Sequence, residues 1–130
     1  MNFITKLQFW VLLSLATWLS LTPQPGEVFE HFWDKGLHLF CWMTLFLSAQ
    51  LGYGKLSAPR HDWRWMTGLF VYASQVEILQ YFVPGRFVSF ADAVANSLGL
   101  AAGLLLWRLW RMTSARWSAA QTLNRWLWVN

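Results

Sequence analysis

Four long apolar segments dominate this chain of 130 residues, and each ends at a proline, a glycine or a charged stretch. A hydrocarbon core about 30 Å thick is crossed by roughly 20 helical residues, which is close to the length of these segments. The segments lack the alternation of apolar and polar residues that a membrane barrel requires, so helices are favoured. Four transmembrane helices are therefore predicted, at residues 7–22, 35–52, 63–83 and 89–110.

The composition agrees with a single membrane domain that covers residues 1–130. Only 12% of the residues are charged, against about 25% in ordinary soluble chains. Lys6 before the first apolar segment resembles the start of a signal peptide, but no small-x-small cleavage site follows and three more segments come after it. We therefore expect the first segment to remain as a membrane span, and no separate soluble catalytic domain.

The basic residues are distributed unevenly over the predicted loops. Most of them fall on the side of the amino terminus: Lys6, Lys55, Arg60, Arg64, Arg108, Arg111, Arg116 and Arg125. The other side keeps Lys35 and Arg86. By the positive-inside rule, both termini are predicted to be cytoplasmic. The net charge of +4 could indicate nucleic-acid binding, but these basic residues lie at the ends of apolar segments, where membrane proteins commonly carry them. Nucleic acid is therefore not expected as a partner.

The tail from residue 114 to residue 128 has the pattern of an amphipathic helix. Its apolar residues recur at helical spacing: Trp117, Ala120, Leu123 and Leu127. Arg116 and Arg125 lie off that face, which predicts an interfacial helix on the cytoplasmic leaflet, with a solvated tail as the alternative. The predicted fold is thus an all-α membrane protein, a four-helix bundle with a C-terminal interfacial helix.

Polar and ionisable side chains, which are energetically unfavourable inside a bilayer, lie toward the extracytoplasmic end of this predicted bundle. Glu77 precedes Val83 by six residues, which is about 9 Å along a helix. Asp92 follows the Pro84-Gly85 turn by a similar distance, so the two carboxyl groups return to one depth. Intramembrane carboxylates are functional candidates by default, although polar groups of this kind also hold helices together by hydrogen bonds.

Together these groups predict one polar pocket with the following binding residues: Asp34, Lys35, His38, Glu77, Gln80, Arg86, Ser89, Asp92 and Asn96. Arg86 is expected to contact an anion, because its planar guanidinium suits phosphate or carboxylate. A metal site at the acidic residues and His38 is conceivable, but no metal-binding spacing or phosphate loop occurs, so neither metal nor cofactor is expected. Cys41 is interpreted as a packing residue and His61 as a solvated loop residue.

One stripe of the fourth segment continues from polar to small residues: Ser89, Asp92, Asn96, Gly99 and Gly103. Small residues at this spacing let a second helix approach closely. The polar part of the stripe is therefore expected to face the bundle interior.

Five separated motifs occur in order: Asp34-Lys35-Gly36-Leu37-His38, Glu77-x-x-Gln80, Pro84-Gly85-Arg86, Ser89-x-x-Asp92 and Asn96-x-x-Gly99. Over residues 34–103 this pattern resembles the VanZ-like family of bacterial integral membrane proteins. The resemblance implies the bacterial cytoplasmic membrane and an accessory role in the cell envelope, since the member that gives the family its name takes part in glycopeptide antibiotic resistance. Trp42 departs from the tyrosine that relatives commonly carry there.

The leading hypothesis is binding of a polar or anionic lipid headgroup, or of a lipid-linked envelope precursor, rather than catalysis. One alternative is a membrane hydrolase or transferase acting on phosphorylated lipids, with His38 as base or nucleophile and Asp34 or Asp92 orienting it. Another is a small proton-coupled transporter that uses the carboxyl groups. Four short helices could transport a solute only as an oligomer or around a very small one, so a homo-oligomer is left open.

Overall fold

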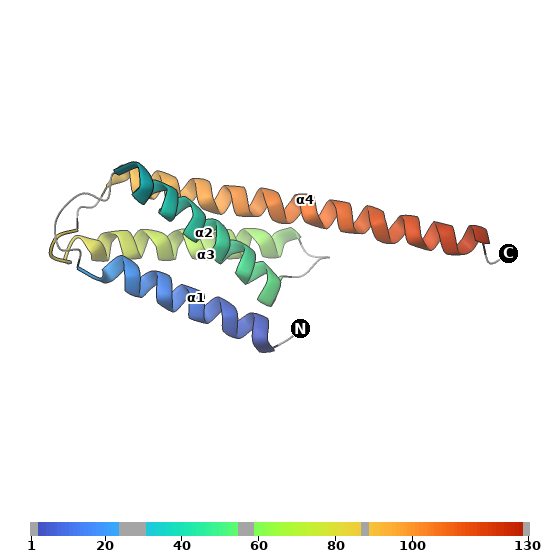
Figure 1. Cartoon of the computed structure of the whole chain (residues 1–130), viewed down its shortest axis with the longest axis horizontal. Helices are drawn as coiled ribbons and strands as arrows, with labels where there is room; N and C mark the ends of the chain where they lie inside the picture. Colours follow the sequence, from blue (N-terminus) through green and yellow to red (C-terminus); the bar gives the residue numbers. More distant parts are fainter. Residues whose placement is uncertain (1–2, 24–30, 55–58, 87–88, 129–130) are drawn as a thin grey trace.

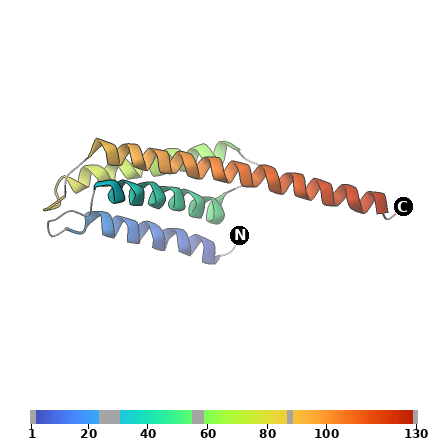
Figure 2. The same cartoon turned by 45° about the horizontal axis from the view of Figure 1, so that its top comes forward.

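The computed structural model is a bundle of four helices that run alternately up and down (Figure 1). It describes residues 3–23, 31–54, 59–86 and 89–128. The helices are α1 (Phe3–Leu21), α2 (His31–Tyr53), α3 (Pro59–Gln80) and α4 (Phe90–Trp128). The last turns of α1 and α3 and the first turns of α2 and α4 lie together at one end, called here the outer end (Figures 1 and 2). The opposite end of the three shorter helices is the inner end. The prediction of an all-α fold is confirmed.

The contact between α2 and α4 is the most extensive in the bundle. It depends on glycine: a Cβ atom at Gly99 would collide with the carbonyl oxygen of Leu39, and one at Gly103 would lie 3.1 Å from the carbonyl oxygen of Met43. The small-residue stripe therefore serves close helix packing, as predicted. Around this contact lies the apolar core, formed by Phe9, Trp42, Leu45, Phe46, Ala49, Leu69, Ala73, Leu100, Leu104 and Trp107.

The surface of the bundle is apolar while several of its buried residues are polar. Among the described residues, α1 and residues 90–117 of α4 are long and apolar enough to cross a membrane. Large apolar side chains are also exposed on α2 and α3, among them Leu37, Phe40, Phe70, Val71 and Ile78. The buried polar residues in the described part of the chain are Ser48, Gln50, Asp62, Glu77, Gln80, Asp92 and Asn96. Such a distribution suits lipid outside and polar contacts inside.

Helix α4 is longer than the sequence predicts. It has 39 residues and a length of about 58 Å, and its C-terminal part projects beyond the other helices (Figure 1). The sequence predicts one helix ending at residue 110 and a second starting at residue 114, but the structure has no break there. Residues 110–114 contain neither proline nor glycine, and the hydroxyl group of Thr113 bonds back to the carbonyl oxygens of Leu109 and Trp110 within the helix. Nothing in this stretch ends a helix.

The other helix ends also differ from the predicted spans. Helices α1, α2 and α3 each begin four residues before the predicted position. Helix α3 ends at Gln80 rather than residue 83, because residues 81–83 form tight turns in which each backbone N–H donates to a carbonyl oxygen three residues earlier.

Candidate functional site

Two side chains from the end of α3 and the following turn cap the C-terminal end of α1. Arg86 donates from Nη2 to the carbonyl oxygen of Leu19 at 2.7 Å and from Nε to that of Thr22 at 3.3 Å. Gln80 donates from Nε2 to the carbonyl oxygen of Ser20 at 3.0 Å. The last carbonyl groups of a helix have no partner within the helix, and they carry partial negative charge. The guanidinium group therefore both satisfies and neutralises this helix end.

The Pro84-Gly85 turn places Arg86 where it can reach α1. Gly85 has a φ of 78°, a left-handed conformation that glycine adopts without steric cost. The backbone N–H of Arg86 then donates to the carbonyl oxygen of Val83 at 3.1 Å, which closes the turn.

The N-terminal end of α4 is held by a carboxyl group of α3. The backbone N–H of Ser89 donates to Oε1 of Glu77 at 3.4 Å, and the hydroxyl oxygen of Ser89 accepts from the N–H of Ala91 at 3.2 Å. Ser89 is thus the N-cap of α4. Glu77 and Asp92 are each only 6% exposed, and the positive end of the helix dipole favours carboxylates at this place.

A hydrogen bond joins α2 to α4 at the same depth. Nδ1 of His38 and Oδ1 of Asn96 are 2.9 Å apart. Because an amide oxygen only accepts, Nδ1 of the ring is the donor. Asn96 is buried, so this contact fixes the orientation of the His38 ring.

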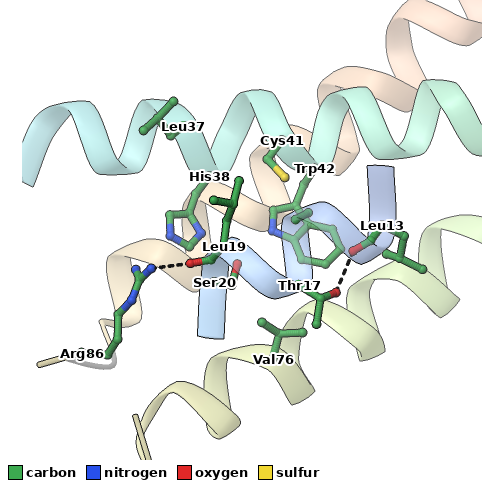
Figure 3. Close-up of a pocket in the computed structure, with 11 residues that line it drawn as sticks. Leu13, Thr17, Leu19, Ser20, Leu37, His38, Cys41, Trp42, Val76 and Arg86 are labelled. Atoms are coloured by element: carbon green, nitrogen blue, oxygen red, sulfur yellow. Dashed lines mark hydrogen bonds between the residues drawn. The ribbon is translucent and has the colours of Figure 1, made fainter. Parts of the chain in front are cut away.

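Cavity A, of about 310 Å³, lies between α1, α2 and α3 (Figure 3). Its lining residues are Leu13, Ala16, Thr17, Leu19, Ser20, Leu37, His38, Cys41, Trp42, Val76 and Arg86. Figure 3 shows His38 and Arg86 toward one end of the cavity and Leu13 and Trp42 toward the other. The cavity thus combines a cationic, hydrogen-bonding end with a largely apolar interior.

Cavity B, of about 290 Å³, lies between α3 and α4. Its lining residues are Phe70, Ala73, Ser74, Glu77, Phe90, Ala93, Val94, Asn96, Ser97 and Leu98. Since His38 lines cavity A and Asn96 lines cavity B, their hydrogen bond runs between the two cavities.

The structure therefore distributes the predicted binding residues over several places. His38 and Arg86 line cavity A, and Glu77 and Asn96 line cavity B. Four other predicted residues are not among the described lining residues of either cavity: Lys35, Gln80, Ser89 and Asp92. Lys35 is partly exposed in the second turn of α2, whereas the side chain of Asp34 lies outside the described residues.

A second buried polar cluster lies at the inner end and is absent from the predicted site. Arg111 contacts Asp62 at 3.1 Å, and the Asp62 side chain is fully buried. Gln50 is also buried, and its amide has no hydrogen-bond partner among the described residues. His61, expected in a loop, lies partly buried in the first turn of α3. One signal could have found Arg111, because the Gly99-Gly103 stripe continues at the same spacing to Trp107 and Arg111.

The described residues contain no group of three His, Cys, Asp or Glu side chains placed to hold a metal ion.

The sequence profile of the VanZ/LLP1 family matches residues 2–111, which include all of α1, α2 and α3 and the first part of α4. Searches among curated proteins and among solved structures found no match.

Proposed function

The chain belongs to the VanZ/LLP1 family, and we propose that it is a multi-pass membrane protein that binds an anionic lipid in cavity A. The observation that carries the proposal is the make-up of this cavity, in which Arg86 and His38 share an otherwise largely apolar lining. Its volume of about 310 Å³ is at the lower limit of ordinary ligand sites. It suits a headgroup and the first part of an acyl chain.

Arg86 retains binding capacity although it caps α1. A guanidinium group has five N–H donors in a planar fork and stays charged at any physiological pH. Two of these donors are used on α1 carbonyl oxygens. The other three have no hydrogen-bond partner among the described residues and can serve a phosphate or carboxylate group. The contacts with α1 hold the side chain in place, so little conformational entropy is lost when a ligand binds.

His38 supplies the second polar contact at the same end of the cavity. Its Nδ1 forms a hydrogen bond with Oδ1 of Asn96, and this contact holds the imidazole ring in one orientation. An imidazole can donate or accept a hydrogen bond, and in its charged form it adds attraction to an anion. The apolar residues Leu13, Ala16 and Val76 then accommodate hydrocarbon.

The proposed topology has four membrane spans with both termini in the cytoplasm. The exposed apolar residues on α2 and α3 support their placement in lipid, and the basic residues favour this orientation. The outer end then faces the extracytoplasmic side, where envelope precursors linked to lipid are used. The projecting end of α4 includes Arg116 and Arg125, and basic residues of this kind are attracted to the cytoplasmic lipid surface. The proposal includes an accessory role in the cell envelope and in glycopeptide susceptibility, which membership of the VanZ/LLP1 family suggests.

A second candidate is a hydrolase or transferase that acts on phosphorylated lipid. The observation that favours it is the His38–Asn96 hydrogen bond, because a general base needs a second group to hold its ring. The two candidates differ in one result. An enzyme releases product from a polyprenyl phosphate or phospholipid, and its His38→Ala variant binds without turnover, whereas a binding protein shows no turnover in either form.

Cys41 offers a direct test, since it is the one cysteine of the chain and lines cavity A. Its reaction rate with a maleimide should fall in proteoliposomes that contain phosphatidylglycerol, compared with phosphatidylcholine alone. Arg86→Gln should remove this difference. Gln80→Leu is the matched control, because Gln80 also caps α1 but does not line the cavity. Equal rates in both lipids for the unmodified protein would refute the proposal.

A further inference from the structure

Cavity B has no role in the function proposed above, and most of its polar side chains offer hydrogen-bond acceptors. Glu77 supplies a carboxylate. The hydroxyl groups of Ser74 and Ser97 donate to carbonyl oxygens of their own helices, at 2.9 and 2.8 Å. A hydroxyl whose hydrogen is used in this way presents only acceptor lone pairs to the cavity. Among the described residues that line cavity B, the amide nitrogen of Asn96 is the remaining side-chain donor.

The remaining lining residues strengthen the same preference. Phe70 and Phe90 line cavity B, and the faces of aromatic rings attract cations. Among the described residues that line this cavity none is basic, in contrast to cavity A with Arg86. A ligand rich in donors and positively charged complements such a lining.

We infer that cavity B is a second amphiphile site, which binds an ammonium headgroup through Glu77, the acceptor oxygens of Ser74 and Ser97, and the phenylalanine rings. A primary ammonium group has three donors, which can meet the carboxylate and the two serine oxygens. The pair of Glu77 with an ammonium group is a charge-assisted hydrogen bond, which is stronger than a neutral one.

The ligand reaches cavity B from the lipid. Four of its lining residues are exposed apolar side chains on the outer surface of the bundle: Phe70, Phe90, Val94 and Leu98. They continue the cavity into the lipid-facing surface of α3 and α4, where a hydrocarbon chain can lie. The chemical class is therefore a lipid or single-chain amphiphile with an amine headgroup, bound independently of the anion in cavity A.

The test uses a thiol placed in cavity B. In the Cys41→Ser, Ala93→Cys protein, whose new thiol lines cavity B without replacing a proposed headgroup contact, the maleimide reaction rate is measured in maltoside micelles with added dodecylamine, which is cationic at neutral pH, or with dodecanol or dodecyl phosphate. Dodecylamine should slow the reaction several-fold relative to maltoside micelles without additive, whereas dodecanol and dodecyl phosphate should not. Slowing of equal size by dodecanol would overturn the inference, because the site would then select hydrocarbon and not charge.

Two further measurements separate this site from cavity A. Glu77→Gln in the same protein should abolish the effect of dodecylamine while preserving the fold, since the glutamine oxygen can still accept from the Ser89 N–H. Retention of the full effect would overturn the inference. Cys41 of the unmodified protein should not be protected by dodecylamine. If dodecylamine protects Cys41 as well as the thiol introduced by Ala93→Cys, binding is non-specific and the inference fails, whatever the anion does in cavity A.

Discussion

The hydrogen bond between Nδ1 of His38 and Oδ1 of Asn96, 2.9 Å long, separates a cavity that contains an arginine from one that contains a glutamate. It also ties α2 to α4, the two helices with the most extensive contact in the bundle. Removing its acceptor should therefore affect both stability and the orientation of His38.

Asn96→Leu should destabilise the protein, because His38 loses this hydrogen bond while it remains partly buried. The expected cost is about 1–3 kcal/mol in the free energy of unfolding. Unfolding in mixed micelles, followed by circular dichroism, measures it. Ser74→Ala is the control, since that hydroxyl bonds to its own helix. Equal stability of the two variants would contradict the assigned role of Asn96.

Gly99→Ala should force α2 and α4 apart, because the new methyl group collides with the Leu39 carbonyl oxygen. The expected destabilisation is about 1–3 kcal/mol. Gly68→Ala provides the opposite case: a Cβ atom there meets no described atom within 4 Å. That change should raise the free energy of unfolding by about 0.5–1 kcal/mol, because alanine loses less backbone conformational entropy than glycine when the helix forms. Similar effects of both substitutions on the unfolding midpoint would disprove the packing argument.

Arg111→Leu should leave the fully buried Asp62 without its cation. Breaking a buried ion pair on one side costs about 3–5 kcal/mol. The double variant Asp62→Leu, Arg111→Leu should recover most of this loss, since no unpaired charge remains. A double variant as unstable as the single one would show that the pair itself, and not its imbalance, holds α3 to α4. The free energy of unfolding of both variants is measured in mixed micelles by circular dichroism, as for Asn96→Leu.

Gln80→Leu should weaken the cap of α1 by about 1 kcal/mol, because the Ser20 carbonyl oxygen loses its side-chain donor. Lipid selectivity should stay unchanged in this variant. Limited proteolysis near the end of α1 reports the loosened helix end. Unaltered proteolysis in Gln80→Leu would mean that Arg86 alone is sufficient to hold α1.

The helical class, the outer polar end and the glycine contact of α4 could be predicted because they depend on spacing along one helix. Depth follows from residue number, so the common depth of Glu77 and Asp92 could also be predicted. The division of the polar residues between two cavities could not, because it depends on how each helix is rotated against its neighbours.

Backbone groups explain one further difference. Arg86 and Gln80 donate to backbone carbonyl oxygens at the end of α1. Every residue has such a carbonyl group, so the pattern of side chains does not predict these contacts. Asp62 lies beside Arg60 and Arg64 in the sequence and resembles a solvated loop residue, although its partner Arg111 is far away in the chain. The continuity of α4 could have been predicted from the absence of a helix breaker between residues 110 and 114.

The central claim is that cavity A selects an anionic lipid, and Trp42 reports on it because it lines that cavity. The measurement is quenching of Trp42 fluorescence by lipids with brominated acyl chains, taken as the difference between the full protein and its Trp42→Phe variant. Brominated phosphatidylglycerol should quench Trp42 more strongly than brominated phosphatidylcholine, and Arg86→Gln should abolish the preference while Gln80→Leu keeps it. Equal quenching by the two lipids in the unmodified protein would contradict the account.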